Sequence, residues 1–204
     1  MVLHEYAPEE RLLVRPISMI FPGSDIALTE APHLYRRGGW YYLMVAEGGT
    51  SYGHAVTLAR SREITGPYEC HPQTPLITSV SDRAGFDRAV ADGGDITPHL
   101  YDGLQKAGHG SMAPVTDEEW VLAHLSGRPL PGRLACPLGR ETALQKLMWK
   151  EDGWPWPESQ SPAEEVSFST TGDPTATRSD WVEEFDGPEW APELQTLRLP
   201  ADER

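Results

Sequence analysis

The five residues Thr29-Glu30-Ala31-Pro32-His33 contain the first candidate for chemistry in this sequence. Glu30 lies between the apolar residues 26–28 and Leu34. Apolar surroundings favour the neutral form of a carboxyl group over its charged form, so Glu30 is a candidate proton donor. The alternative is a surface glutamate at the start of a strand, and the rest of the chain must decide between the two.

Several other polar residues could form a metal or nucleotide site, but each is better explained by a structural role. His33 and His124 each fall within an expected strand, and their spacing is not that of metal ligands. The glycine-rich loop 47–53 lacks the lysine of a phosphate-binding loop and opens no helix, so it does not indicate a nucleotide site. Asp92 and Asp95 could hold a cation, but in an Asp- and Gly-rich loop a solvated turn is the commoner case. We predict no metal and no cofactor.

The elements that must position these residues are predominantly strands. The chain has 204 residues, with 19 Gly, 19 Pro, 7 Trp and 7 Tyr, and aromatic runs between Gly and Pro punctuation favour an all-β protein. The expected strands fall at 30–37, 40–46, 54–60 and 68–71, a meander of about 40 residues, which is the size of one propeller blade.

A second meander is expected at 107–113, 119–125 and 140–149. The last of these runs also fits a helical period, which leaves a helix as its alternative. The polar segment 82–103 between the meanders is predicted to be a surface loop, and residues 2–14 a short hairpin.

Charge and cysteine content limit the partners. The formal net charge of −14 disfavours nucleic acid and anionic membranes, because both attract basic surfaces. No run of about 18 apolar residues is present, and residues 1–10 lack a signal-peptide pattern. Cys70 and Cys136 are expected to be free thiols in a reducing compartment, which favours a cytoplasmic location; the alternative is a single disulfide between them.

Five ordered motifs carry a family resemblance. They are Thr29-Glu30-Ala31-Pro32-His33, Ala46-Glu47-Gly48-Gly49-Thr50, Leu104-Gln105-Lys106-Ala107-Gly108-His109, Gly127-Arg128-Pro129-Leu130 and Cys136-Pro137-Leu138-Gly139-Arg140-Glu141-Thr142. Together they resemble glycoside hydrolase family 43, most closely its β-xylosidases with a C-terminal β-sandwich. The resemblance implies a five-bladed β-propeller that hydrolyses xylosides or arabinofuranosides from the non-reducing end with inversion. Inversion needs a general acid and a separate base that activates water.

The resemblance also assigns candidate roles to single residues. It makes Glu30 the general acid and Thr50 a residue that lines the sugar site. His109 resembles the histidine beside the bound sugar, and Arg140 the arginine that binds its hydroxyl groups. Without the family, His109 would be read as a structural histidine and Arg140 as a surface or ion-paired residue.

The same resemblance divides the chain. Residues 1–157 are expected to form about two blades of a partial propeller, 158–180 a linker, and 181–204 the first strand of a truncated sandwich. Both family aspartates would precede Met1, so the chain is interpreted as an internal fragment that is inactive alone. The resemblance implies that the full-length form could be a homo-oligomer. The alternative is a non-catalytic carbohydrate-binding remnant. A metal-binding β-module is disfavoured by the scattered histidines.

Overall fold

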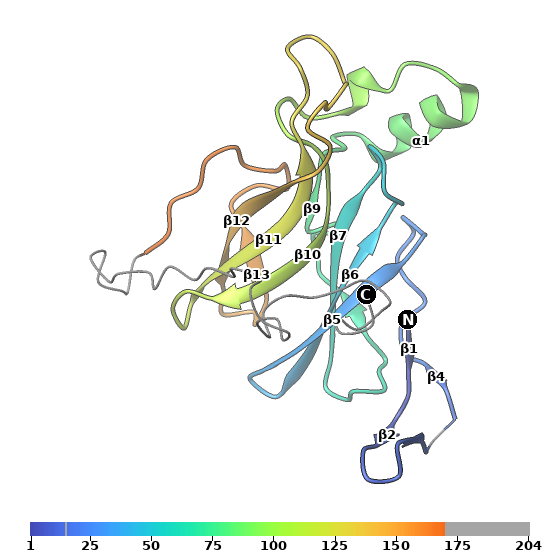
Figure 1. Cartoon of the computed structure of the whole chain (residues 1–204). Helices are drawn as coiled ribbons and strands as arrows, with labels where there is room; N and C mark the ends of the chain where they lie inside the picture. Colours follow the sequence, from blue (N-terminus) through green and yellow to red (C-terminus); the bar gives the residue numbers. More distant parts are fainter. Residues whose placement is uncertain (15, 170–204) are drawn as a thin grey trace, which may run out of the picture. The chain divides into compact units, whose positions relative to one another are not determined.

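The computed structural model describes residues 1–14 and 16–169 (Figure 1). Thirteen strands, one α-helix and one short 3-10 helix lie in this part of the chain. The strands are β1 (Val2–Leu3), β2 (Tyr6–Ala7), β3 (Leu12–Leu13), β4 (Ser18–Met19), β5 (Glu30–Arg37), β6 (Trp40–Glu47), β7 (Ala55–Ser61), β8 (Glu69–Cys70), β9 (Ile77–Thr78), β10 (Gln105–Pro114), β11 (Glu119–Gly127), β12 (Glu141–Trp149) and β13 (Pro155–Pro157). The helices are α1 (Arg83–Asp92) and the 3-10 helix η1 (Thr97–His99).

The first meander forms one antiparallel sheet in the order β5-β6-β7-β8, with β9 added beside β7. Gly38 and Gly39 turn β5 into β6 with φ values of +55° and +73°, which glycine adopts without steric cost. Strand β6 is buried along most of its length, as its continuous apolar sequence predicts.

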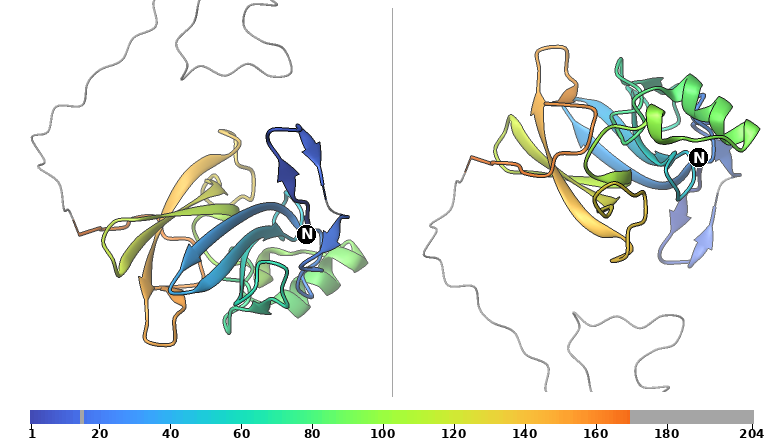
Figure 2. Two further views of the ribbon diagram at one scale, coloured as in Figure 1. Left: turned by 90° about the horizontal axis from the view of Figure 1, so that it is seen from below. Right: turned by 90° about the horizontal axis from the view of Figure 1, so that it is seen from above.

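The second meander forms an antiparallel sheet in the order β10-β11-β12-β13. The run that could also have been helical is strand β12, paired with β11 from Glu119↔Met148 to Ser126↔Glu141. The two sheets lie side by side (Figure 2). The predicted all-β class, with sheets of the propeller-blade type, is confirmed.

The predicted surface loop at 82–103 is wrong in part, because it contains α1 and η1. Asp82 caps the helix by accepting a hydrogen bond from the Gly85 N–H at 3.0 Å. Gly93 ends it in the left-handed conformation, with φ +65°. A capping aspartate and a terminal glycine therefore mark the two ends of this helix. Its polar composition gives no apolar pattern by which the sequence would predict it.

The N-terminal segment forms a narrow antiparallel ribbon, in which β1 pairs with β4 and β2 with β3. This confirms the predicted hairpin. In Figure 1 the ribbon projects away from the first sheet. Its large apolar side chains, such as Leu13 and Met19, are mostly exposed, at 61% and 68%.

The main hydrophobic core lies between the two sheets. Its buried members are Tyr42, Met44, Val56, Leu58, Leu76, Ile77, Ala107, Met112, Leu122, Leu147 and Trp154. A smaller core, built around Phe21, Leu43 and Val45, covers the opposite face of the first sheet. These two cores explain why β6 is buried on both faces.

The predicted start of a sandwich at 181–204 and residues 170–180 of the predicted linker lie outside the described residues. Cys70 and Cys136 are both free, as expected. Neither helix in the described part of the chain has the length and apolar character needed to cross a bilayer.

Candidate functional site

Three of the four predicted site residues come together because of the meander topology. Glu30 is the first residue of β5, Thr50 follows the end of β6, and Arg140 directly precedes β12. In antiparallel sheets, the start of one strand lies beside the end of its neighbour, so Glu30 and Thr50 share one edge of the first sheet, and Arg140 reaches this edge from the second sheet. A hydrogen bond joins two of them, since Nη2 of Arg140 donates to the carbonyl oxygen of Thr50.

The fourth predicted residue, His109, lies within β10, the strand that packs against the first sheet. Its φ is +53°, and the pairing of β10 with β11 shifts register on both sides of Gly108. A similar shift follows Glu30 in β5, where Ala31 has φ +51°. Bulges of this kind redirect side chains and are common beside active sites. Both Glu30 and His109 are therefore presented by irregular backbone.

A buried histidine, His54, links these residues electrostatically. It is only 1% exposed, and its Nδ1 lies 3.2 Å from the carbonyl oxygen of Lys106. Burial lowers the pKa of His54, and that hydrogen bond raises it. The charges of Arg140 and His109 lower it further, and that of Glu30 raises it. The three predicted groups are thus close enough to His54 for their charges to affect its pKa.

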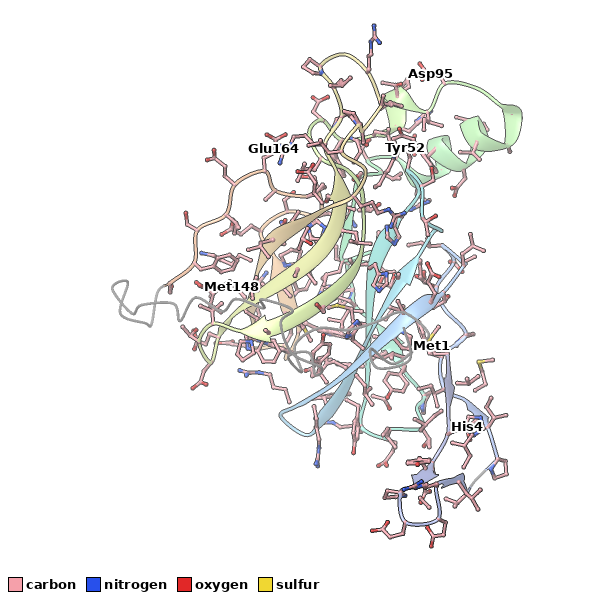
Figure 3. All side chains as sticks on the ribbon, viewed as in Figure 1. Met1, His4, Tyr52, Asp95, Met148 and Glu164 are labelled. Carbon is pink, nitrogen blue, oxygen red and sulfur yellow. The ribbon has the colours of Figure 1, made fainter. Side chains whose placement is uncertain are left out.

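The rim of this edge is formed by the loop after β6 and the loop between β11 and β12. The hydroxyl of Tyr52 donates to the carbonyl oxygen of Leu134 at 2.5 Å. The ammonium group of Lys106 lies 4.6 Å from the centre of the Tyr52 ring. Figure 3 shows Tyr52 towards the end of the molecule where α1 lies. Met148, near the C-terminal end of β12, lies farther from α1. These contacts hold the 128–140 loop against the first sheet.

The environment of Glu30 differs from the apolar one that the sequence predicts. Its side chain is exposed, so the apolar residues around it in sequence do not enclose it. The reason lies in the backbone, because Ala27 and Leu28 both adopt positive φ and turn away, leaving Leu28 itself 71% exposed. The assignment of Glu30 as the acid stays a prediction, without the local desolvation that the sequence suggested.

Two pockets lie near these residues. One, of about 260 Å³, is lined by His33, His109 and His124, together with residues of β10, β11 and β12. Within residues 1–14 and 16–169, no group of three potential ligands is arranged to hold a metal ion. A larger pocket, of about 400 Å³, lies over the 128–134 loop, and none of the four predicted residues lines it.

Sequence reasoning missed Glu47, the last residue of β6. It is fully buried and accepts hydrogen bonds from the segment that leads into Glu30. The signal was available, because a glutamate closes an otherwise apolar strand directly before Gly48 and Gly49. Buried acidic side chains are rare unless they are paired, so such a position merits a search for its partners.

The two antiparallel sheets are of the kind that form the blades of a β-propeller, and Glu30, Thr50 and Arg140 lie at one edge of them. The family model described as "Glycosyl hydrolases family 43" matches residues 1–155, and the chain belongs to this family. It is 46% identical over 163 residues to a β-xylosidase of Bacillus subtilis, covering 76% of this chain and 27% of that protein. It is 32% identical over 148 residues to a non-reducing end α-L-arabinofuranosidase of Bacteroides ovatus, covering 72% and 25%.

Among solved structures, the chain resembles xylan β-1,4-xylosidase from Bacillus halodurans C-125. The sequence identity is 46% and the TM-score 0.71, over 98% of this chain and 35% of that one. The chain spans about a quarter to about a third of the length of the relatives named here. The family predicted from the five motifs is therefore confirmed.

Proposed function

We propose that this chain supplies the general acid and part of the sugar-binding site of a glycoside hydrolase that releases xylose or arabinose from the non-reducing end of xylo-oligosaccharides. The observation that carries the proposal is the meeting of three separate motifs, with Glu30, Thr50 and Arg140 at one edge of the sheets. Relatives named β-xylosidase and α-L-arabinofuranosidase support both sugars as substrates.

In this mechanism Glu30 donates a proton to the oxygen of the leaving group. A second carboxylate, far enough away to admit a water molecule, activates that water on the opposite face of the sugar. The exposure of Glu30 lets a substrate oxygen reach it. Arg140 offers a planar fork of donors for adjacent hydroxyl groups.

We expect the base to come from an aspartate outside this chain. The free thiols fit the proposed cytoplasmic location.

The test combines sugar binding with hydrolysis. We expect the purified chain to bind xylobiose in a titration followed by NMR, and Arg140→Ala to weaken that binding about tenfold or more, because it removes charged hydrogen bonds. Arg133→Ala is the matched control, since Arg133 is exposed on the same loop and lines the other pocket. Glu30→Gln should retain binding. Hydrolysis of 4-nitrophenyl β-D-xylopyranoside by the chain alone should be undetectable.

Two outcomes would contradict this proposal in different ways. Turnover by the chain alone that disappears in Glu30→Gln would show that a base is present and that the chain is a complete catalyst. A folded chain that binds neither xylobiose nor an arabinofuranoside would remove the sugar site itself. Binding without a contribution from Glu30 to catalysis, even in a longer chain with further blades, would favour a carbohydrate-binding remnant.

A further inference from the structure

Glu47 is a buried acidic side chain for which the proposed chemistry has no use. It ends β6 and is 0% exposed. Its two carboxyl oxygens accept four hydrogen bonds, two on each oxygen. A buried carboxyl group is costly unless its oxygens are paired, so four donors in one place indicate a site built around this side chain.

Three of the four donors come from the short segment that leads into Glu30. The Ser24 N–H and the Thr29 hydroxyl donate to Oε1 of Glu47 at 2.8 and 2.9 Å. The Ser24 hydroxyl donates to Oε2 at 2.5 Å. The fourth donor, the hydroxyl of Thr57 at 2.6 Å, belongs to β7 in the sheet itself. Glu47 thus ties the segment before Glu30 to the rigid sheet.

Two further hydrogen bonds lie within this segment: the Ile26 N–H donates to the Ser24 hydroxyl at 3.2 Å, and the Ala27 N–H donates to the Ser24 carbonyl oxygen at 3.3 Å. Ala27 and Leu28 have φ values of +65° and +56°, a conformation that side chains disfavour, and the Leu28 side chain is exposed. A backbone hydrogen bond from the Gly48 N–H to the Ala27 carbonyl oxygen, at 2.9 Å, joins the middle of the turn to the end of β6. The donor is the residue directly after Glu47, so this bond belongs to the same anchor.

The fit around the carboxyl group is close. Gly23 has φ +101°, and a Cβ atom there would lie 2.1 Å from the Thr29 hydroxyl oxygen and 2.9 Å from Oε1 of Glu47. Only glycine leaves room for the chain to wrap around the acidic group at this point. The segment therefore follows the side chain of Glu47 closely from Gly23 to Thr29.

We propose that Glu47 is the positioning residue for Glu30, acting through the hydroxyl of Thr29, the residue directly before the acid. This inference rests on the proposed role of Glu30. Glu47 itself is buried away from any substrate, so it acts on the direction of the acid and not on the sugar. If Glu47 had only a structural role, the loss of any one of its four hydrogen bonds would have the same effect on Glu30.

Two matched substitutions separate these roles. Thr29→Val and Thr57→Val are isosteric, and each removes one hydroxyl donor to the same carboxyl group. Only Thr29 is joined directly to Glu30. The measurements are the side-chain ¹³C signal of Glu30, the amide hydrogen exchange of Gly48, and the melting temperature of the 204-residue chain. Thr29→Ser restores the hydroxyl and serves as the rescue variant.

We expect Thr29→Val to shift the Glu30 signal and to accelerate exchange of the Gly48 amide about tenfold, the effect of losing one hydrogen bond to a charged or strongly polar group. Thr57→Val should lower the melting temperature to a similar extent and leave both local signals in place. Thr29→Ser should return them to their original positions. If Thr29→Val does not fold, Ser24→Ala provides the same test from the other end of the segment.

Two results would overturn the positioning role and leave Glu47 as a structural anchor. One is an equal change of the local signals in the two valine variants, and the other is a Glu30 signal that changes in neither variant. None of these measurements needs bound sugar. A chain that binds no sugar but whose Glu30 signal follows Thr29 refutes only the proposed function. A chain that binds sugar while its Glu30 signal ignores Thr29 refutes only the positioning role.

Discussion

At the scale of single residues, the contact between Gly108 and His54 leaves little room for change. Gly108 lies in β10, directly before His109, and is buried. A Cβ atom at Gly108 would lie 2.3 Å from Cγ of the His54 ring. The ring is itself buried, so neither partner has open space to move into. The absence of a side chain at Gly108 is therefore a requirement of the packing.

Gly108→Ala should lower the free energy of unfolding by about 2 kcal/mol or more, the cost of forcing extra volume into a packed interior. Because β10 must shift to relieve the contact, the signals of His109 should also move in an NMR spectrum. Gly94→Ala is the control, since the nearest atom to a Cβ there is 3.6 Å away, an ordinary contact. Urea unfolding of both variants measures the difference, and equal stability would contradict the predicted clash.

Residue types in ordered motifs were enough to select Glu30, Thr50, His109 and Arg140, because the family resemblance fixes them by position along the chain. The environment of Glu30 was not predictable in the same way. Apolar neighbours in sequence enclose a side chain only if the backbone directs them towards it, and the positive φ of Ala27 and Leu28 directs them elsewhere. The burial of Glu47 likewise depends on donors contributed by two other segments.

At the scale of elements, a hydrogen bond connects β5 and β10, the first strand of each sheet. The backbone N–H of Met112 in β10 donates to the hydroxyl oxygen of Tyr35 in β5 at 2.9 Å. Burial raises the pKa of the Tyr35 phenol, and the hydrogen bond from Met112 lowers it. Since β5 begins at Glu30 and β10 contains His109, this bond sets the relation between two candidate site residues.

Tyr35→Phe should lower the free energy of unfolding by about 1–2 kcal/mol, because it leaves the buried N–H of Met112 without its acceptor. Tyr68→Phe offers the comparison. The Tyr68 hydroxyl donates at 3.0 Å to the carbonyl oxygen of Ile64 within one exposed turn, so its loss should change stability by less than about 0.5 kcal/mol. Chemical denaturation of the two variants gives both values. A larger loss in Tyr68→Phe would mean that the hydrogen bond between the sheets is not the stronger tie.

The strands were predictable because their periods are strong, above all the continuous apolar run of β6 and its glycine turn. The helix α1 was missed because only Gly85 and Phe86 of its ten residues are buried, so its apolar stripe is nearly absent. Its end signals, Asp82 and Gly93, were present and could have identified it. The bulges in β5 and β10 depend on the partner strand, which a single segment cannot reveal.

At the scale of the whole molecule, the titration of buried histidines should govern stability in mild acid. His54, His71 and His124 are each no more than 2% exposed, and burial lowers the pKa of all three. The effect is largest for His71, whose pKa falls from 6.5 to about 4. Nδ1 of His71 lies 3.1 Å from the carbonyl oxygen of Gln73 and 3.0 Å from its backbone N–H, so the ring nitrogen donates or accepts there according to its tautomer.

The direction of the pH dependence follows from proton counting. Between about pH 6.5 and 4 the unfolded chain carries a proton on residue 71 that the folded chain lacks, so stability rises with pH across this window and is lost as the pH falls. His71 alone should account for about 3 kcal/mol between pH 7 and 4.

His71→Gln should therefore lower stability at pH 7, because the ring packs edge to face against Trp154 at 4.9 Å, yet flatten the decline towards pH 4. The measurement is the free energy of unfolding in urea at several pH values, with His4→Gln as the exposed control. What matters is the slope with pH and not the stability at one pH, because the slope reports the proton that folding excludes from the ring. An unchanged slope in His71→Gln would assign the acid sensitivity to the carboxyl groups of this acidic chain instead.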